Sequence, residues 1–423
     1  MDSFLIILLI VYFLIKVCFA YRDARKLDIL VFVYLIYLVI SLFSLLLYNH
    51  PNYYNSGLQI TLIPFIYFII FFEITLYPIK YISKKKVLRV SPPNNLIFYA
   101  LTIFSVLVSI MCLPSMISGF KTGILGIMTD NTLFKDIYVS NNLGLNSGGG
   151  SNLPSVFQSV LGYISILMLF YYFTIEHKKV WVVISLLFSV LILPGRYIAN
   201  ADRTGLVTFI FSLIGSFLLF RQFYQPRFLR YVKLLIYLPL LLIILVIVAI
   251  TFSRFKGDEL FYSIYSYLGQ PLINFNLYCL DAGGDRNGDR VFSMIKGFVD
   301  PNAASSYAQR ISKYSHLSID ESYFVTYVGD IVLDFGPILA LILAILFFSL
   351  LKSLIRYSSS TYQYPFHNYI LIFIVLCMIT EGWSLYRYGD ISGNVRLFGL
   401  VILYFIFKIF SSKPSDSHPD VHN

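Results

Sequence analysis

The feature that most constrains this chain is a series of long apolar segments, most of them near 20 residues in length. A helix needs roughly 20 apolar residues to cross the hydrocarbon of a bilayer, where its backbone must satisfy its own hydrogen bonds. Only 13% of the 423 residues are charged, well below the proportion in soluble domains. We therefore predict an all-α, polytopic integral membrane protein with about 11 transmembrane helices, in a single membrane domain over residues 1–423. The predicted spans are 3–20, 28–47, 59–79, 96–116, 153–173, 180–198, 204–220, 234–253, 324–350, 369–385 and 395–412.

Lys and Arg gather in alternate loops, and this pattern predicts the orientation. Basic residues accumulate in cytoplasmic loops, so these loops are expected in the cytoplasm, the N-terminus outside, and the tail 413–423 inside. The same rule explains the net charge of +10 without nucleic acid as a partner. A basic patch follows the first apolar segment instead of preceding it, which favours a transmembrane helix over a secretory signal. The basic loops contain Arg22, Arg25 and Lys26; Lys80, Lys84, Lys85, Lys86 and Arg89; Lys178 and Lys179; Arg221, Arg227, Arg230 and Lys233; and Lys352 and Arg356.

Two long segments are predicted outside, 117–152 and 254–323, the second between the eighth and ninth helices. Long segments in compact proteins are usually functional. Within the second, the run DRNGDR at 285–290 resembles a metal-binding loop, but the interleaved Arg286 and Arg290 argue against a cation site. We predict neither a metal ion nor a cofactor, since the chain has no P-loop, GxSxG or HExxH motif.

Several arginines lie on the predicted outer side, against the general trend. One interpretation is an anion site, because guanidinium groups bind phosphate oxygens in pairs. The alternative is that each arginine pairs with a carboxylate such as Asp202 or Asp390, or extends from a helix end. For the set as a whole we favour the anion site. Its candidate members are Arg196, Arg203, Arg254, Arg290 and Arg387, and Arg396 flanks the same last outer turn as Arg387.

Carboxylates mark the start of the ninth span. Tyr323, Tyr327, Asp330 and Asp334 are spaced to share one helical face. Ionisable groups within a span usually face a cavity or a partner, so these are either site residues or partners of an outer arginine. The Gly336–Pro337 pair is expected to loosen the helix and let another element approach.

Two further acidic residues fall within spans. Glu381, in the tenth, is either a partner for a basic residue or a site residue. Glu73 lies nearer the cytoplasm and is interpreted as structural, while Lys16 is expected to extend toward the cytoplasmic interface.

Three sequence features together resemble one family. ADRTGL (201–206) opens the seventh span, the long segment follows the eighth, and ESYFVTYVGDIVLDFGPILALILAIL (321–346) enters the ninth. The arrangement resembles the Wzy-type oligosaccharide repeat-unit polymerases, also called O-antigen or capsular polysaccharide polymerases, of the bacterial cytoplasmic (inner) membrane. Thr326 and Asp334-Phe335-Gly336 match that family's pattern, and Pro337 replaces the usual glycine.

The resemblance implies transfer of a glycan from one polyprenyl-diphosphate-linked oligosaccharide to another. The arginines would stabilise the diphosphate leaving group, with Arg203 matching the family best. Asp330, Asp334 or Glu321 would act as general base toward the acceptor hydroxyl. The implied partners are the lipid-linked oligosaccharide, the bilayer and a protein that regulates chain length. A polysaccharide ligase shares the same donor and stays an alternative, as does a lipid-linked oligosaccharide flippase, although the long segment 254–323 counts against a flippase.

Overall fold

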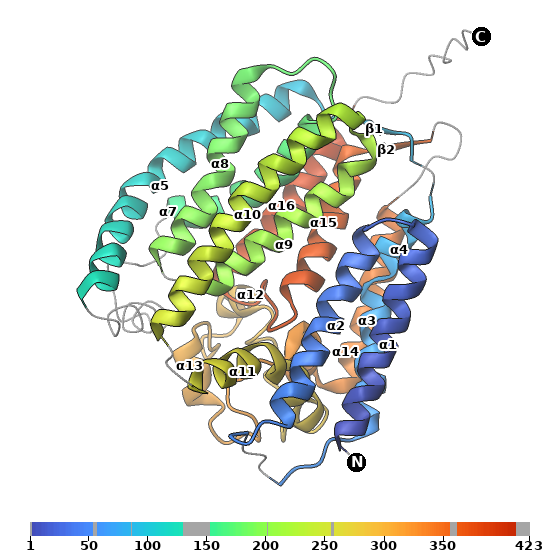
Figure 1. Ribbon diagram of the computed structural model, residues 1–423, viewed down its shortest axis with the longest axis vertical. Helices are drawn as coiled ribbons and strands as arrows, with labels where there is room; N and C mark the ends of the chain where they lie inside the picture. The colour runs from blue at the N-terminus through green and yellow to red at the C-terminus, as the bar shows by residue number, and fades with distance from the viewer. Residues whose placement is uncertain are drawn as a thin grey trace.

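The computed structural model describes residues 2–53, 57–85, 87–129, 153–200, 202–254, 258–355 and 362–411. Within them the chain is almost entirely helical (Figure 1). The helices that follow the apolar segments are α1 (Asp2–Ala24), α2 (Ile29–Tyr48), α3 (Leu62–Thr75), α4 (Tyr77–Ser83), α5 (Asn95–Thr129), α7 (Leu153–Tyr172), α8 (Val180–Ala199), α9 (Arg203–Phe220), α10 (Pro226–Arg254), α14 (Thr326–Leu354), α15 (Phe366–Glu381) and α16 (Ile391–Ile409). The shorter elements are β1 (Arg89–Ser91), η1 (Arg221–Phe223), α11 (Asp258–Asn274), η2 (Phe275–Cys279), α12 (Ser293–Val299), α13 (Tyr307–Lys313) and β2 (Gln363–Pro365).

The predicted spans all coincide with helices. Among the described residues, 9 helices are long and apolar enough to cross a membrane. The pair α3 and α4, bent by 48°, makes a tenth candidate when counted as one span. The remaining predicted span, 369–385, corresponds to α15, which is a shorter apolar helix. The protein is an all-α polytopic membrane protein, as the apolar segments predicted.

The bundle has two distinct ends. One end holds the parallel pair of β1 and β2, and the other holds the N-terminus and the short helices α11, α12 and α13 (Figure 1). The predicted basic loops meet at the first end. Arg221 donates to the Leu27 carbonyl across 2.9 Å, and Lys352 donates to the Tyr77 hydroxyl across 2.6 Å. We call this the basic end and the opposite one the covered end.

The helix α15 lies at the centre of the bundle. Its described residues from Phe366 to Glu381 are all buried except His367, which is partly exposed. Helices α1 and α10 lie at the periphery, where Leu and Ile side chains such as Leu14 and Leu241 are about half exposed. A peripheral helix in a membrane protein meets lipid and needs a continuous apolar surface, whereas a short central helix such as α15 is surrounded by protein.

The segment predicted as a long polar loop, 254–323, is folded over the residues that the structure describes. Helix α11 packs so closely on α2 that the Ser44 hydroxyl donates to the Gly269 carbonyl across 2.8 Å. A Cβ atom at Gly269 would lie 2.5 Å from the Phe43 carbonyl oxygen, so only glycine permits this approach. The Asn276 amide exchanges two hydrogen bonds with the Thr61 backbone. This segment therefore forms a fixed cover over one end of the bundle.

Some predicted boundaries need correction. Helix α5 continues to Thr129, so the first part of the predicted loop 117–152 is helical, and residues 130–152 lie outside the described ranges. Helix α14 begins at Thr326, which has a φ of 69°. Tyr323 therefore precedes the helix and does not share its face. The predicted tail 413–423 also lies outside the described residues.

Candidate functional site

The helix α14 is broken at Gly336, two residues after Asp334. Gly336 has φ 70° and ψ 164°, a conformation that is strained for any residue with a Cβ atom. Pro337 follows it and has no backbone N–H to donate. The DRNGDR loop (residues 285–290) approaches this break, where a Cβ at Gly336 would lie 3.3 Å from the Asp285 carboxylate. Tyr67 of α3 donates to the Pro337 carbonyl across 2.6 Å. The prediction that Gly336–Pro337 lets another element approach is confirmed.

The DRNGDR loop donates hydrogen bonds to the backbone carbonyls that the break leaves without helical partners. The N–H groups of Arg286 and Asn287 donate to the carbonyls of Leu333 and Asp334, each across 2.9 Å. The loop can turn back in this way because Asn287 and Gly288 both have positive φ, at 53° and 91°. Asn-Gly is the residue pair that most readily adopts such a turn. The loop therefore replaces the hydrogen bonds that a continuous helix would have made.

The two aspartates of α14 bind the same arginine. Asp334, fully buried, accepts the backbone N–H of Arg290 at 3.1 Å and that of Val291 at 2.6 Å. Asp330 accepts the Arg290 side chain through Nε at 2.8 Å and Nη2 at 2.6 Å. Its second oxygen accepts the backbone N–H of Tyr386, from the turn between α15 and α16. Three segments far apart in the sequence thus meet at Arg290.

Glu321 completes the group. Its carboxylate contacts Arg286 Nε at 2.9 Å, Arg290 Nη1 at 2.6 Å and Arg310 Nε at 3.8 Å, and its side chain is 1% exposed. Charges this deeply buried are stable only when they are paired and hydrogen-bonded. The structure brings together all three predicted carboxylates. We name the group the Arg290 cluster, which consists of Arg286, Arg290, Arg310, Glu321, Asp330 and Asp334.

The arginines in the cluster are not equally compensated. Burial disfavours the charge of Arg290, but Asp330 and Glu321 outweigh it and raise the pKa of the guanidinium above its ordinary value. Arg310 shows the opposite behaviour, since burial and the neighbouring charge of Arg290 lower its pKa. Its buried Nε has no hydrogen-bond partner among the described residues. Arg310 therefore keeps an unused N–H donor within the cluster.

A second ion-pair group holds the short helices in place. Asp289 contacts the ammonium groups of Lys296 at 2.9 Å and Lys313 at 2.8 Å, and it accepts the Tyr314 hydroxyl. Burial would raise the pKa of Asp289, but these three donors together bring it below its ordinary value. The contacts connect α12 and α13 to the DRNGDR loop.

Most of the other predicted arginines lie outside the cluster. Arg196 donates to the Ser155 carbonyl at 3.2 Å. Arg203 donates to the Thr251 hydroxyl at 3.4 Å, and its guanidinium lies 5.8 Å from the centre of the Tyr267 ring. For Arg254 the structure describes the helical backbone but not the side chain.

The turn that contains Arg387 contacts the Arg290 cluster through its backbone. Its neighbour Tyr386 donates to Asp330, and a Cβ at Gly389 would lie 2.1 Å from the Arg290 carbonyl oxygen. The Nε of Arg387 is buried and has no hydrogen-bond partner within the described ranges. Like Arg310, it is a guanidinium with donor capacity to spare.

The two aspartates considered as arginine partners have another role. Asp202 accepts the Gly205 N–H and caps α9, and Asp390 accepts the Gly393 N–H and caps α16. Short polar side chains at these positions satisfy the free N–H groups of a helix start. Neither forms an ion pair with an arginine in the part of the chain that the structure describes.

Glu381 and Arg396 form a separate buried ion pair. Glu381 was expected either to pair with a basic residue or to belong to the site, and it lies 2.9 Å from Arg396. Ser212 donates to the same carboxylate at 2.7 Å. The Arg396 guanidinium also lies 4.3 Å and 4.5 Å from the ring centres of Tyr163 and Tyr388. The pairing interpretation of Glu381 is confirmed.

Two members of the cluster were not selected from the sequence as site residues. Arg286 was noted only as an argument against a metal site, although its place in DRNGDR could have identified it. Arg310 is one of many charged residues in a long segment, and no motif marks it.

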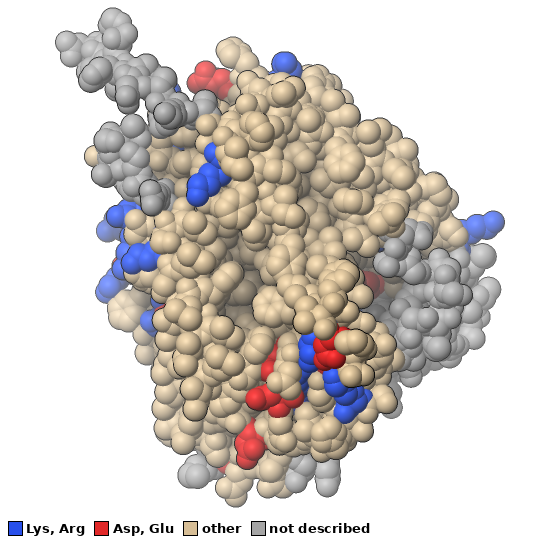
Figure 2. Space-filling model, turned by 180° about the vertical axis from the view of Figure 1, so that it is seen from behind, with Lys and Arg blue, Asp and Glu red and all other residues tan. Residues whose placement is uncertain are grey.

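On one face of the molecule, Lys and Arg lie together with Asp and Glu toward the covered end, below a broad surface of uncharged residues (Figure 2).

The comparisons with known proteins add no identification. No family model, curated protein or solved structure matches the chain. Over the described residues, no three His, Cys, Asp or Glu side chains are grouped so that they could hold a metal ion. The site therefore rests on the chemistry of its arginines and carboxylates.

Proposed function

We propose that this protein is a membrane glycosyltransferase that polymerises polyprenyl-diphosphate-linked oligosaccharide repeat units. The reaction would take place on the outer face of a bacterial cytoplasmic membrane, with the covered end and N-terminus outside and the basic end in the cytoplasm. The observation that carries the proposal is the Arg290 cluster, which joins the segment 254–323 to the broken helix α14. The orientation is supported by the basic residues that gather at one end of the bundle.

The proposed reaction releases a strongly anionic group. The acceptor hydroxyl forms a bond to the anomeric carbon of the donor glycan, the bond from that carbon to the diphosphate oxygen breaks, and the hydroxyl proton passes to water. Positive charge that is fixed before the reaction stabilises the leaving oxygen without reorganising. Arg310 and Arg387 suit this role because each has a buried Nε without a hydrogen-bond partner among the described residues.

The carboxylates fit a positioning role better than that of a free base. Asp330 and Asp334 accept backbone N–H groups as well as interacting with Arg290. Glu321 contacts three arginines. Each carboxylate oxygen of these three side chains therefore already accepts an N–H group, and a substrate hydroxyl would have to displace one of these donors. In the proposed mechanism these residues hold Arg290 and Arg310 in place for the diphosphate.

The test uses purified protein and a single lipid-linked repeat unit, with the products separated by length. A ladder of lengths is expected. Arg310→Lys and Arg387→Lys keep the charge but lose the paired donors, so each should reduce the rate by about tenfold or more. Arg227→Lys is the matched control, because Arg227 is exposed at the basic end.

Each alternative has its own outcome. A single transfer product would indicate a ligase instead of a polymerase. Translocation of the lipid-linked glycan without a change in its length would indicate a flippase. Full activity in both Arg310→Lys and Arg387→Lys would remove the proposed role of these arginines.

A further inference from the structure

A groove lies between α3–α4 and α14, in the half of the bundle nearer the basic end. It forms because the chain bends by 48° between α3 and α4, so that α4 turns away from the line of α3. Its volume is about 490 Å³, within the range of pockets that hold small ligands. The residues that line it are Ile69, Ile70, Glu73, Ile74, Tyr77, Ile345, Phe348 and Ser349.

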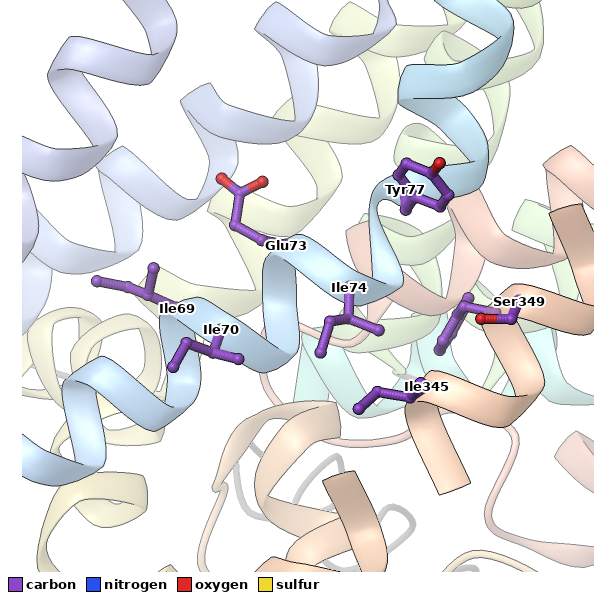
Figure 3. Close-up of a pocket in the computed structure, with 8 residues that line it drawn as sticks. Ile69, Ile70, Glu73, Ile74, Tyr77, Ile345 and Ser349 are labelled. Carbon is purple, nitrogen blue, oxygen red and sulfur yellow. The ribbon is translucent and has the colours of Figure 1, made fainter. Parts of the chain in front are cut away.

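The groove is apolar and open on one side. Figure 3 shows Ile74 of α3 and Ile345 of α14 pointing toward each other, while the Glu73 carboxylate points away from α14. Phe348 is buried at 3% exposure, whereas Ile70 and Ile345 are 47% and 46% exposed. A buried ring and exposed isoleucines thus line the same groove. Such a surface on a membrane-spanning bundle matches a hydrocarbon chain better than it matches water.

The end of the groove nearest the basic loops carries positive charge. Lys352 donates to the Tyr77 hydroxyl at 2.6 Å, and its ammonium lies 4.7 Å from the centre of the same ring. An ammonium group has three donors, so Lys352 keeps capacity for an anion. Of the carboxylates that the structure describes, none forms an ion pair with it.

The other cations nearby are balanced only in part. Glu73 pairs with both Lys80 and Lys16, the latter at 3.1 Å, and it accepts hydroxyls from Tyr12 and Tyr34. One carboxylate therefore faces two ammonium groups beside the groove. Together with Lys352 this leaves an excess of positive charge where the groove meets the basic end.

We propose that this groove binds one anionic glycerophospholipid from the leaflet at the basic end, with its phosphate on Lys352 and Tyr77 and an acyl chain along Ile74, Ile345 and Phe348. Basic groups between membrane helices on this side of a bilayer attract anionic headgroups. The apolar groove directly beside these basic groups provides the surface for the acyl chain. The site is separate from the Arg290 cluster and does not depend on the proposed reaction.

The experiment is native mass spectrometry of the delipidated full-length protein, titrated with phosphatidylglycerol or phosphatidylcholine of the same acyl chains. Phosphatidylglycerol should give a discrete first adduct at lower concentration than phosphatidylcholine. Lys352→Gln should weaken that first adduct about fivefold, the effect of one basic residue near an anionic surface. Ser349→Trp, which fills the groove without changing charge, should weaken it as well.

The matched control is Lys408→Gln. Lys408 lies at the end of α16 with its ammonium 5.4 Å from the centre of the Tyr404 ring, a similar lysine–tyrosine contact away from the groove. It should leave the first adduct unchanged. The proposal fails if Lys352→Gln and Lys408→Gln have equal effects, or if inorganic phosphate displaces the lipid completely. Preferential binding of undecaprenyl phosphate over phosphatidylglycerol would overturn the choice of occupant.

Discussion

Two groups of paired charges in this protein differ in how deeply they are buried. In the Arg290 cluster, the Asp330, Glu321 and Arg290 side chains are 4%, 1% and 9% exposed. In the Glu73 group, formed by Glu73, Lys16 and Lys80 with two tyrosines, Glu73 is 22% exposed and Lys16 is 34% exposed. The first group uses arginine, whose planar donors fix geometry, and the second uses lysine, whose ammonium is a mobile point charge.

The two groups also differ in what they connect. The Arg290 cluster joins the DRNGDR loop, α13, the start of α14 and the turn after α15, which are distant in the sequence. The Glu73 group joins the successive helices α1, α2, α3 and α4. A group that connects distant segments with rigid donors is suited to a preorganised site. A group of flexible side chains beside an open groove is suited to a surface that adapts to lipid.

The largest difference between the two groups is expected when each of them loses one basic residue. Arg290→Met leaves Asp330 buried without its cation, and breaking a buried pair costs about 3–5 kcal/mol of unfolding free energy. Lys16→Met leaves Glu73 with Lys80 and two hydroxyls, so the cost should be about 1 kcal/mol or less. Unfolding of both variants in detergent measures the difference. Equal losses would show that the contrast between the groups has no energetic basis.

The break in α14 should come next in size. Gly336→Ala places a side chain where φ is 70° and ψ is 164°, a conformation that costs about 1–3 kcal/mol for residues with a Cβ. The Cβ would also approach the Asp285 carboxylate and disturb the DRNGDR loop. Gly297→Ala in α12 is the control, because a Cβ there meets nothing within 4 Å. It should be neutral or slightly stabilising, and a loss equal to that of Gly336→Ala would contradict the argument.

This contrast also shows how far the sequence could predict the fold. Apolar periodicity is local, so it placed the spans, the shared face of Asp330 and Asp334, and the loosening at Gly336–Pro337. It also gave Glu73 a structural role and left Glu381 as either a partner of a basic residue or a site residue, and the first interpretation of Glu381 is the one the structure has. Each of these follows from the residues within a few helical turns.

The predictions that depend on tertiary contact were incomplete. Arg290 was selected as an anion binder, yet its side chain is taken up by Asp330 and Glu321, residues 40 and 31 positions away. Arg310 could not be selected because its place depends on how α13 packs against the DRNGDR loop. No local pattern encodes that packing, which the buried ion pairs of Asp289 help to fix.

The ion pairs of Asp289 predict how stability depends on pH. Because the folded-state pKa of Asp289 is lowered, its contribution is fully present above the ordinary value of 3.8 and is lost as the pH falls through the folded pKa. Asp289→Asn should therefore reduce the difference in melting temperature between pH 6 and pH 3. Asp281→Asn, a change in the same segment at an exposed carboxylate, is the control. Identical pH profiles for wild type and Asp289→Asn would refute the role of this group.

The smallest effect is expected for Glu73→Gln, and it tests the comparison in the bilayer itself. Gln keeps the hydrogen bonds to Tyr12 and Tyr34 but leaves Lys16 and Lys80 without their carboxylate. Long lysine side chains can extend to the interface, so the loss should stay within about 1 kcal/mol. The measurement is unfolding in nanodiscs, with Asp330→Asn as the buried counterpart. If Glu73→Gln costs as much as Asp330→Asn, the lysines cannot reach the interface, and the Glu73 group is as fixed as the Arg290 cluster.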